Sequence, residues 1–148
     1  MAESVKSVPV TSSAVMPRLF CRDVPGEIEF CKVAFEAVEV IRRPGPDGTI
    51  IHGLVTIAGA MIMIEAEFPT LPSRVPQLDG SSPVVIYVYV ENVDQAVERA
   101  VAAGAKVLIP VQDQFWGDRI GWIMDTALNL TAAQKVWDVS SESQSLGR

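Results

Sequence analysis

The chain has 148 residues, of which 49% are hydrophobic and 20% charged, and its formal net charge is −6. This length and composition favour one ordered globular domain with a buried core, and they exclude a disordered acidic chain. The net negative charge gives no electrostatic basis for binding nucleic acid or an anionic membrane.

The sequence carries no sign of export or membrane insertion. Its two cysteines, Cys21 and Cys31, fit neither a disulfide framework nor a metal-ligand spacing. No segment approaches the roughly 18 consecutive apolar residues of a membrane-spanning helix. Residues 1–15 are too polar for the apolar core of a signal peptide, so we expect a flexible N-terminal arm and a cytoplasmic location. Residues 139–148 are expected to form a flexible tail.

The first half of the chain predicts a strand, a helix and three further strands. Residues 16–24 are typical of a short strand with a turn. A helix is expected over 24–38, with Ile28, Cys31, Phe35 and Val38 on one face. Strands are then expected at 38–43, 49–57 and 60–68, separated by turns at 44–48 and 58–59.

The second half repeats this order of elements. A strand at 83–90 precedes a helix over 92–104, which has Asn92 as its N-cap, Gln95 three residues later and Gly104 at its end. Three strands are then expected at 105–111, 118–124 and 128–137.

Matching residues in the two halves are separated by a constant 69 positions, as in the pairs Asp23 and Asn92, Val38 and Val107, and Gly48 and Gly117. A constant offset indicates a duplicated βαβββ unit. The sequence therefore predicts an α+β fold with one domain over 16–138. Its parts are module one (16–68), a proline-rich linker (69–82) and module two (83–138).

The paired βαβββ modules, the text "EIEFCKVAF" and the stretch "DQFWGDRIGWIMD" resemble the glyoxalase/bleomycin-resistance/extradiol-dioxygenase superfamily, also called vicinal oxygen chelate. The resemblance covers about residues 16–138 and points to a glyoxalase-like branch. It implies that each sheet curls into a half-barrel and that two half-barrels enclose a pocket. It also implies a homodimer.

Metal-dependent members of that superfamily carry His, Glu or Gln on the first and last strands of each module. The resemblance places these ligand points at Met16 and Met63 in module one, and at Val85 and Ala132 in module two. None of these side chains suits a hard or borderline divalent cation, which prefers imidazole, thiolate or oxygen donors. We therefore expect neither a metal nor another cofactor.

Residues two apart in a strand share a face, so the predicted pocket faces extend from these points. A turn at Ala58 and Gly59 sets residue 57 opposite 60, and hence His52, the only histidine, opposite Glu65. A neighbouring carboxylate can fix the tautomer of an imidazole and raise its basicity, as in a general base. The alternative is a structural hydrogen bond near the pocket rim.

Arg18 is expected to face the same pocket, where it needs an anionic partner. That partner is either a ligand carboxylate, phenolate or phosphate, or a protein carboxylate, Glu65 or Asp23, in a structural ion pair. Mainly apolar and aromatic ligand contacts are predicted for Phe20, Leu54, Met63, Tyr87, Tyr89, Trp116, Trp122 and Gln134, although such side chains more often form core.

The stretch "DQFWGDRIG" (113–121) corresponds to the turn at 44–48, so Gly117 is expected in a turn. Asp118 and Arg119 can pair with each other or with neighbours, and Phe115 and Trp116 can cover the pocket mouth. We interpret the stretch as a structural lid rather than a catalytic loop. The sequence has no Gly-rich phosphate loop, Ser–His–Asp set or Cys–His pair.

Three functions remain open, because this fold supports many chemistries. The first is a metal-independent binding protein of glyoxalase/bleomycin-resistance type for an apolar small molecule with an anionic or aromatic group. The second is a metal-free isomerase, cyclase or lyase in which His52 and Glu65 transfer a proton. The third is a structural or interaction module. The expected partners are a small-molecule ligand and a second copy of the chain.

Overall fold

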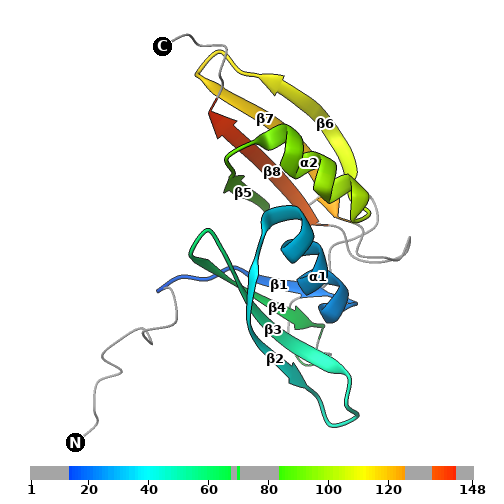
Figure 1. The fold of residues 1–148 in the computed structure, drawn as a ribbon. Helices are drawn as coiled ribbons and strands as arrows, with labels where there is room; N and C mark the ends of the chain where they lie inside the picture. Colours follow the sequence, from blue (N-terminus) through cyan, green and yellow to red (C-terminus); the bar gives the residue numbers. More distant parts are fainter. Residues whose placement is uncertain (1–13, 68–69, 71–83, 126–134, 143–148) are drawn as a thin grey trace, which may run out of the picture.

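The computed structural model describes residues 14–67, 70, 84–125 and 135–142. Module one contains β1 (Arg18–Cys21), α1 (Val24–Phe35), β2 (Val38–Pro44), β3 (Ile50–Ile57) and β4 (Ala60–Ala66). Module two contains β5 (Val85–Tyr89), α2 (Val93–Ala102), β6 (Lys106–Asp113), β7 (Asp118–Asp125) and β8 (Lys135–Glu142). The predicted order, βαβββ twice, is confirmed (Figure 1).

The two modules share one topology. The strand order is β1-β4-β3-β2 in the first sheet and β5-β8-β7-β6 in the second. In each sheet the first and last strands of the module pair in parallel, and the other pairs are antiparallel. The predicted α+β fold of two βαβββ modules is therefore correct.

The duplication extends to the hairpin turns. Gly48 and Gly117 have φ angles of 83° and 103°, which glycine adopts without a steric penalty. Their N–H groups donate to the carbonyl three residues earlier, of Gly45 at 3.0 Å and of Gln114 at 3.2 Å. Residues that correspond at the offset of 69 therefore make the same hydrogen bond in both modules. Gly117 has the turn role that the sequence predicted.

Helix α2 begins at the predicted N-cap Asn92, and α1 begins at Asp23, which corresponds to Asn92 at the offset of 69. The Asp23 side chain accepts from the Gly26 N–H at 3.0 Å, and the Asn92 side chain accepts from the Gln95 N–H at 3.1 Å. The predicted extent of α1 is wrong at its C-terminal end. The helix ends at Phe35, because Glu36 turns into the left-handed region with φ 56°, so Val38 begins β2 instead.

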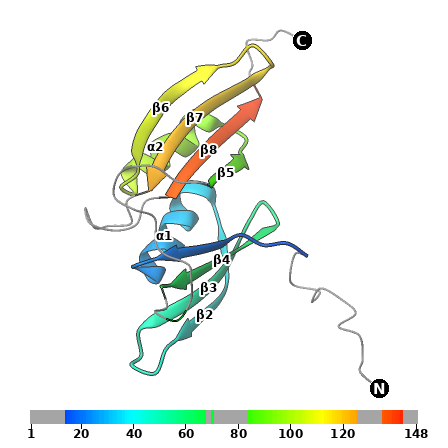
Figure 2. The same cartoon turned by 180° about the vertical axis from the view of Figure 1, so that it is seen from behind.

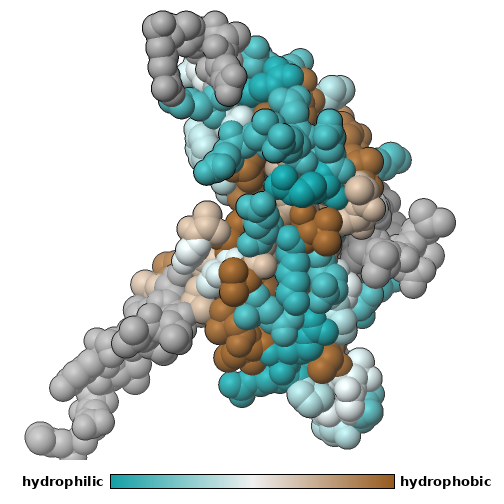
Figure 3. Space-filling model, in the orientation of Figure 1, coloured by the Kyte–Doolittle hydropathy of each residue, from teal (hydrophilic) through white to brown (hydrophobic). Residues whose placement is uncertain are grey.

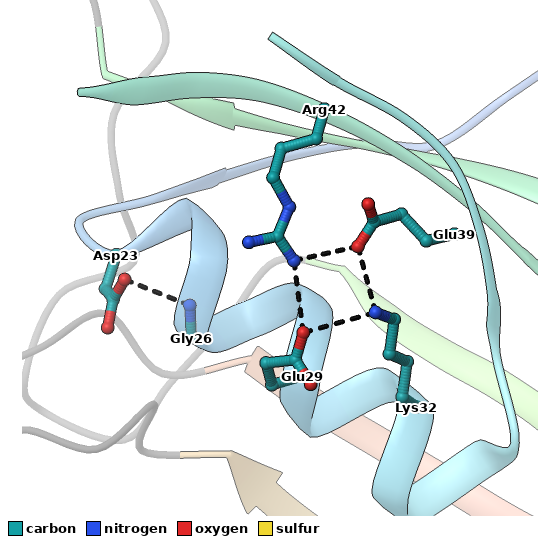
Figure 4. Close-up of polar contacts among 6 residues, drawn as sticks. All are labelled: Asp23, Gly26, Glu29, Lys32, Glu39 and Arg42. Carbon is teal, nitrogen blue, oxygen red and sulfur yellow. Dashed lines mark hydrogen bonds and ion pairs between the residues drawn. The ribbon is translucent and has the colours of Figure 1, made fainter. Parts of the chain in front are cut away.

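A ring of four charged side chains ties α1 to β2 (Figure 4). Glu29 and Lys32 lie on α1, and Glu39 and Arg42 on β2. Each carboxylate contacts both cations at 2.8–3.2 Å. Because the four side chains are 29–56% exposed and solvent weakens their attraction, we expect the group to fix the position of β2 more than to add stability.

The two modules share a single core. Both helices lie on one side of the molecule and contact each other, and the Phe35 ring of α1 lies 4.6 Å from the Trp137 ring of β8 (Figures 1 and 2). Hydrophilic residues run over the outer surface of the helices, with hydrophobic patches beside them (Figure 3). The opposite side of each sheet, which faces away from its helix, is called its open face below.

The last strand differs from the prediction. It runs over Lys135–Glu142, beyond the predicted domain end at 138, so residues 139–142 belong to the sheet and not to a flexible tail. The reason is the connection before it. Nine residues, 126–134, join β7 to β8, whereas Ala58 and Gly59 alone join β3 to β4. Residues of β8 therefore do not correspond to residues of β4 at the constant offset of 69.

In the described part of the chain, neither helix has the length and apolar content needed to cross a membrane.

Candidate functional site

Residues from four strands meet in one row on the open face of the first sheet. Glu65 of β4 lies between Phe20 of β1 and His52 of β3, and His52 lies beside Arg43 of β2. Directly paired residues point to the same face of a sheet, so these four side chains are neighbours. The predicted pairing of His52 with Glu65 is confirmed.

One carboxylate oxygen binds the two basic groups. Glu65 Oε1 lies 2.9 Å from Arg18 Nη2 and 2.9 Å from His52 Nδ1. The Glu65 side chain is only 5% exposed, whereas those of Arg18 and His52 are 52% and 23% exposed. An ionised carboxylate only accepts, so His52 Nδ1 carries a proton and a neutral ring keeps Nε2 as an acceptor.

Arg18 retains donors for another partner. One nitrogen, Nη2, binds Glu65, and the guanidinium carbon lies 5.9 Å from the centre of the Phe20 ring. The described residues offer no other partner to the guanidinium. The predicted ion pair of Arg18 with Glu65 is therefore present, and the half-exposed guanidinium still presents N–H groups to solvent. The role of Arg18 in binding a ligand stays a prediction.

Apolar side chains adjoin these charges on the same face of the sheet. Leu54 pairs with Met63 across β3 and β4, and Met61 lies two residues further along β4 on the same face. Leu54 and Met61 are buried, although neither belongs to the core beneath the helices. The open face of the first sheet thus combines flexible apolar side chains with a polar end.

The sequence reasoning missed Arg43. It is exposed and lies directly opposite His52 in the β2–β3 pair. A signal was present, because Arg43 precedes the predicted turn at 44–48 and a hairpin returns the chain past it. Two shifts in the β2–β3 register make the partner hard to assign without a structure. Arg43 is therefore a second cation near the imidazole of His52, in addition to Arg18.

The register corrects one of the four expected metal-ligand points. Met63 on the last strand of module one pairs with Arg18. In module two the residue that corresponds to Arg18 at the offset of 69 is Tyr87, and its partner on the last strand is Asp138. Ala132, the residue expected at this point, lies outside the described residues, and the register places Asp138 there instead. The corrected set is Met16, Met63, Val85 and Asp138.

This corrected set does not suit a divalent cation. Asp138 is its one oxygen ligand, and the two methionines and the valine offer no donor that a hard or borderline cation prefers. Nor do the described residues contain a group of three or more His, Cys, Asp or Glu side chains that could hold a metal ion.

The remaining predicted contact residues lie on module two. Tyr87 and Trp122 flank Asp138 on the open face of the second sheet, and Tyr89 lies two residues after Tyr87. Trp116 lies in the β6–β7 turn and donates to Asp118 at 3.2 Å. Gln134 lies outside the described residues.

Phe115 and Trp116, the residues of the expected lid, are both exposed. Phe115 is 92% exposed, and its ring meets only the edge of Trp116 at a centroid distance of 4.9 Å. Arg119 pairs with Asp94 at 2.8 Å and with Asp113 at 3.1 Å, and so does not pair with Asp118. The stretch 113–121 is therefore a hairpin whose aromatic tip faces solvent.

Two cavities of the described chain are lined by residues of both modules. One, of about 460 Å³, is lined by the β3–β4 turn and by residues between Tyr89 and Arg99. A second, about 270 Å³, is lined by Met61 of β4 and Tyr87 of β5. Neither includes Arg18, His52 or Glu65, which lie on an open sheet face. We base the candidate site on the chemistry of this face rather than on cavity size.

A model of the glyoxalase/bleomycin resistance protein/dioxygenase superfamily matches residues 18–130, most of the two modules. The chain belongs to this superfamily. Two relatives, uncharacterized proteins of Mycobacterium bovis and Mycobacterium tuberculosis, are each 40% identical to this chain over 115 residues. The match covers 76% of this chain, and 76% and 68% of those proteins.

Solved structures share the fold. TioX from Micromonospora sp. ML1 superimposes with a TM-score of 0.66 at 24% identity, over 89% of this chain and 100% of TioX. A mutant of the fosfomycin resistance protein FosX from Listeria monocytogenes, in complex with Mn(II) and 1S,2S-dihydroxypropylphosphonic acid, gives a TM-score of 0.63 at 18% identity. This match covers 90% of our chain and 92% of FosX. At these identities the likeness concerns the fold alone.

Proposed function

We propose that this superfamily member binds a small, mostly apolar molecule with an acidic group, on the open face of the first sheet. The observation that carries the proposal is the shared Glu65 oxygen, 2.9 Å from both Arg18 and His52. This bond orients Arg18 at the edge of an apolar surface, with its other N–H groups exposed. A ligand carboxylate, phenolate or phosphate would bind there, with Arg43 nearby.

We also propose that binding needs no metal. Met16, Met63 and Val85 cannot supply the ligands that superfamily metal sites use, and Asp138 alone is insufficient. Elemental analysis of the purified protein should find no divalent metal at one ion per chain. A stoichiometric metal that survives dialysis would contradict this part of the proposal.

A second candidate function is proton transfer by His52, as in a metal-free isomerase, cyclase or lyase. It is favoured by the hydrogen bond from Nδ1 to the buried Glu65, because this bond leaves Nε2 as an acceptor on a partly exposed ring. A substrate C–H or O–H group placed at Nε2 by Arg18 would meet an oriented base.

The experiment begins with native mass spectrometry of the purified protein, to identify a co-purified small molecule. Affinity and turnover are then measured for the wild type and for Arg18→Ala, Glu65→Gln and His52→Ala. Lys106→Ala on β6 is the control for loss of one positive charge. Arg18→Ala should weaken binding of an acidic ligand by about 1.5–3 kcal/mol, the contribution of a charge-assisted hydrogen bond.

The outcomes separate the two candidate functions. Lost affinity in Arg18→Ala without turnover in any form favours a binding protein. Turnover that falls in His52→Ala and Glu65→Gln more than affinity does favours the enzyme, because those changes remove the base and its orientation. Unchanged affinity and turnover in all three variants would contradict both functions.

We propose further that the protein is a homodimer. Large apolar side chains are exposed on β6 and at the tip of the β6–β7 turn: Val107, Leu108, Ile109 and Phe115. An apolar surface of this kind favours association. A second copy whose β6 and β6–β7 turn pack over the open face of the first sheet would enclose the apolar side chains beside Arg18.

A further inference from the structure

The open face of the second sheet carries a carboxylate surrounded by aromatic side chains. Asp118 accepts hydrogen bonds from Tyr89 Oη at 2.8 Å, from Trp116 Nε1 at 3.2 Å and from Tyr87 Oη at 3.3 Å. The two tyrosine rings lie 5.5 Å apart. All three donors are neutral, so they hold the carboxylate in place without cancelling its charge.

No cation of the described residues pairs with Asp118. The neighbouring Arg119 is turned toward Asp94 and Asp113. Tyr87 and Tyr89 remain 47% and 57% exposed, so a molecule from solvent can reach both the rings and the carboxylate. A negative charge among exposed aromatic faces is the environment that an organic ammonium ion prefers.

A second carboxylate on the same face points independently to a cation. Asp138 pairs with Tyr87 and Trp122, and it is only 8% exposed. Trp122 donates a hydrogen bond to it, while the described residues offer no donor to its Oδ1. Burial raises the pKa of the Asp138 carboxyl, and the charge of Asp118 raises it further. A buried carboxylate oxygen without a partner is unusual, and a nearby cation would stabilise it.

The two tyrosines also form a wall of an apolar cavity. This space of about 270 Å³ lies between the modules, and its other lining side chains include Val15, Pro17, Met61, Ile62 and Ile86. It is large enough for one ring or a short aliphatic chain. Polar and apolar parts of a ligand could therefore contact opposite ends of the same two tyrosine side chains.

We propose that the cluster of Tyr87, Tyr89, Trp116 and Asp118 binds an organic ammonium ion whose apolar body occupies the neighbouring cavity. The ammonium group contacts the Asp118 carboxylate and the aromatic rings, and Asp138 beneath Tyr87 adds negative potential. The charged part of this site, Asp118 with its three aromatic donors, lies on the other module from the Arg18–Glu65–His52 group and prefers the opposite charge. Variants of Asp118 and of Arg18 therefore test the two proposals separately.

The test uses phenethylammonium as the probe and 2-phenylethanol as its uncharged counterpart. Tyr87 and Tyr89 are the only tyrosines in the chain, so two ring signals in an NMR spectrum of tyrosine-labelled protein report this site alone. We expect phenethylammonium to shift both signals in a saturable way, with an affinity about tenfold or more above that of 2-phenylethanol.

Matched variants locate the charge that matters. Asp118→Asn should reduce the affinity for phenethylammonium about tenfold and leave that for 2-phenylethanol unchanged. Asp47→Asn is the control, because it removes the same charge from the corresponding turn of module one, where Asp47 accepts from the Thr49 N–H. It should bind like the wild type.

Two results would overturn the proposal. One is equal affinity of the wild-type protein for the amine and the alcohol, which needs no variant to interpret. The other is an Asp118→Asn protein, folded by its NMR spectrum, that binds phenethylammonium as the wild type does. An equal loss in Asp47→Asn would likewise assign the effect to net charge and contradict a specific site.

Discussion

His52 and Glu65 are directly opposed on β3 and β4, and a contact of 2.9 Å joins His52 Nδ1 to Glu65 Oε1. The two-residue turn at Ala58 and Gly59 fixes this register, since both residues have positive φ, 49° and 83°, as in a tight hairpin. The position of the imidazole is thus set by the backbone of the hairpin. Its tautomer is set by the carboxylate.

The first prediction concerns that tautomer. His52 is the only histidine, so its two ring nitrogens can be observed directly by 15N NMR. The neutral wild-type ring should carry its proton on Nδ1, because Glu65 accepts there. Glu65→Gln should give a mixture of tautomers. A wild-type ring protonated on Nε2 would contradict the hydrogen bond and the proposed base.

The second prediction concerns the pH dependence of stability through Asp138. Burial raises the pKa of this carboxyl in the folded protein, so folding favours its protonated form. As the pH rises through the pKa that this carboxyl has in the folded protein, its ionisation lowers the free energy of unfolding. This loss of stability is present at neutral pH. Asp138→Asn should therefore be more stable at pH 7, by on the order of 1 kcal/mol.

Urea denaturation of both proteins at several pH values measures this difference. The advantage of Asp138→Asn should shrink as the pH falls toward 3.8, the ordinary value, because the wild-type carboxyl becomes protonated. Asp47→Asn should behave oppositely. The Thr49 N–H lowers the pKa of Asp47, so its charge favours folding at neutral pH. If the stability difference between Asp138→Asn and the wild type did not change over this pH range, the ionisation of Asp138 would not be its cause.

The third prediction concerns Tyr89. Its hydrogen bond to Asp118, and next its contact with Tyr87, raise its pKa to about 12. In a spectrophotometric titration, one of the two tyrosines should ionise above the ordinary value of 10.0. Asp118→Asn should return this step toward the ordinary value, since the negative acceptor is gone. If the tyrosines of the variant ionise at the same pH as those of the wild type, the hydrogen bond between Tyr89 and Asp118 does not form in solution.

The fourth prediction concerns assembly. Light scattering should give twice the chain mass of 16.0 kDa. Phe115→Ser should weaken the dimer, because this side chain is 92% exposed in the single chain. Val33→Ser, at an exposed position on the helix side, is the control and should leave it intact. A wild-type protein of 16.0 kDa across working concentrations would refute the dimer.

The sequence by itself determined the duplicated fold and the His52–Glu65 pair. Both depend on local signals, namely the N-cap Asn92, the turn glycines and a repeat at constant offset. A two-residue hairpin leaves no freedom in register, so the opposition of His52 and Glu65 could be counted from the turn.

Tertiary structure decided what the local signals could not. The connection over 126–134 has no counterpart in module one, so the offset fails there and Asp138, not Ala132, reaches the open face level with Tyr87. The Glu36 conformation ended α1 before Val38. Asp118 was expected to pair within its own loop or with neighbours, but the tyrosines that bind it come from β5, about 30 residues earlier in the chain. Contacts between distant segments depend on how the strands of a sheet are ordered, and that order is a property of the packed molecule.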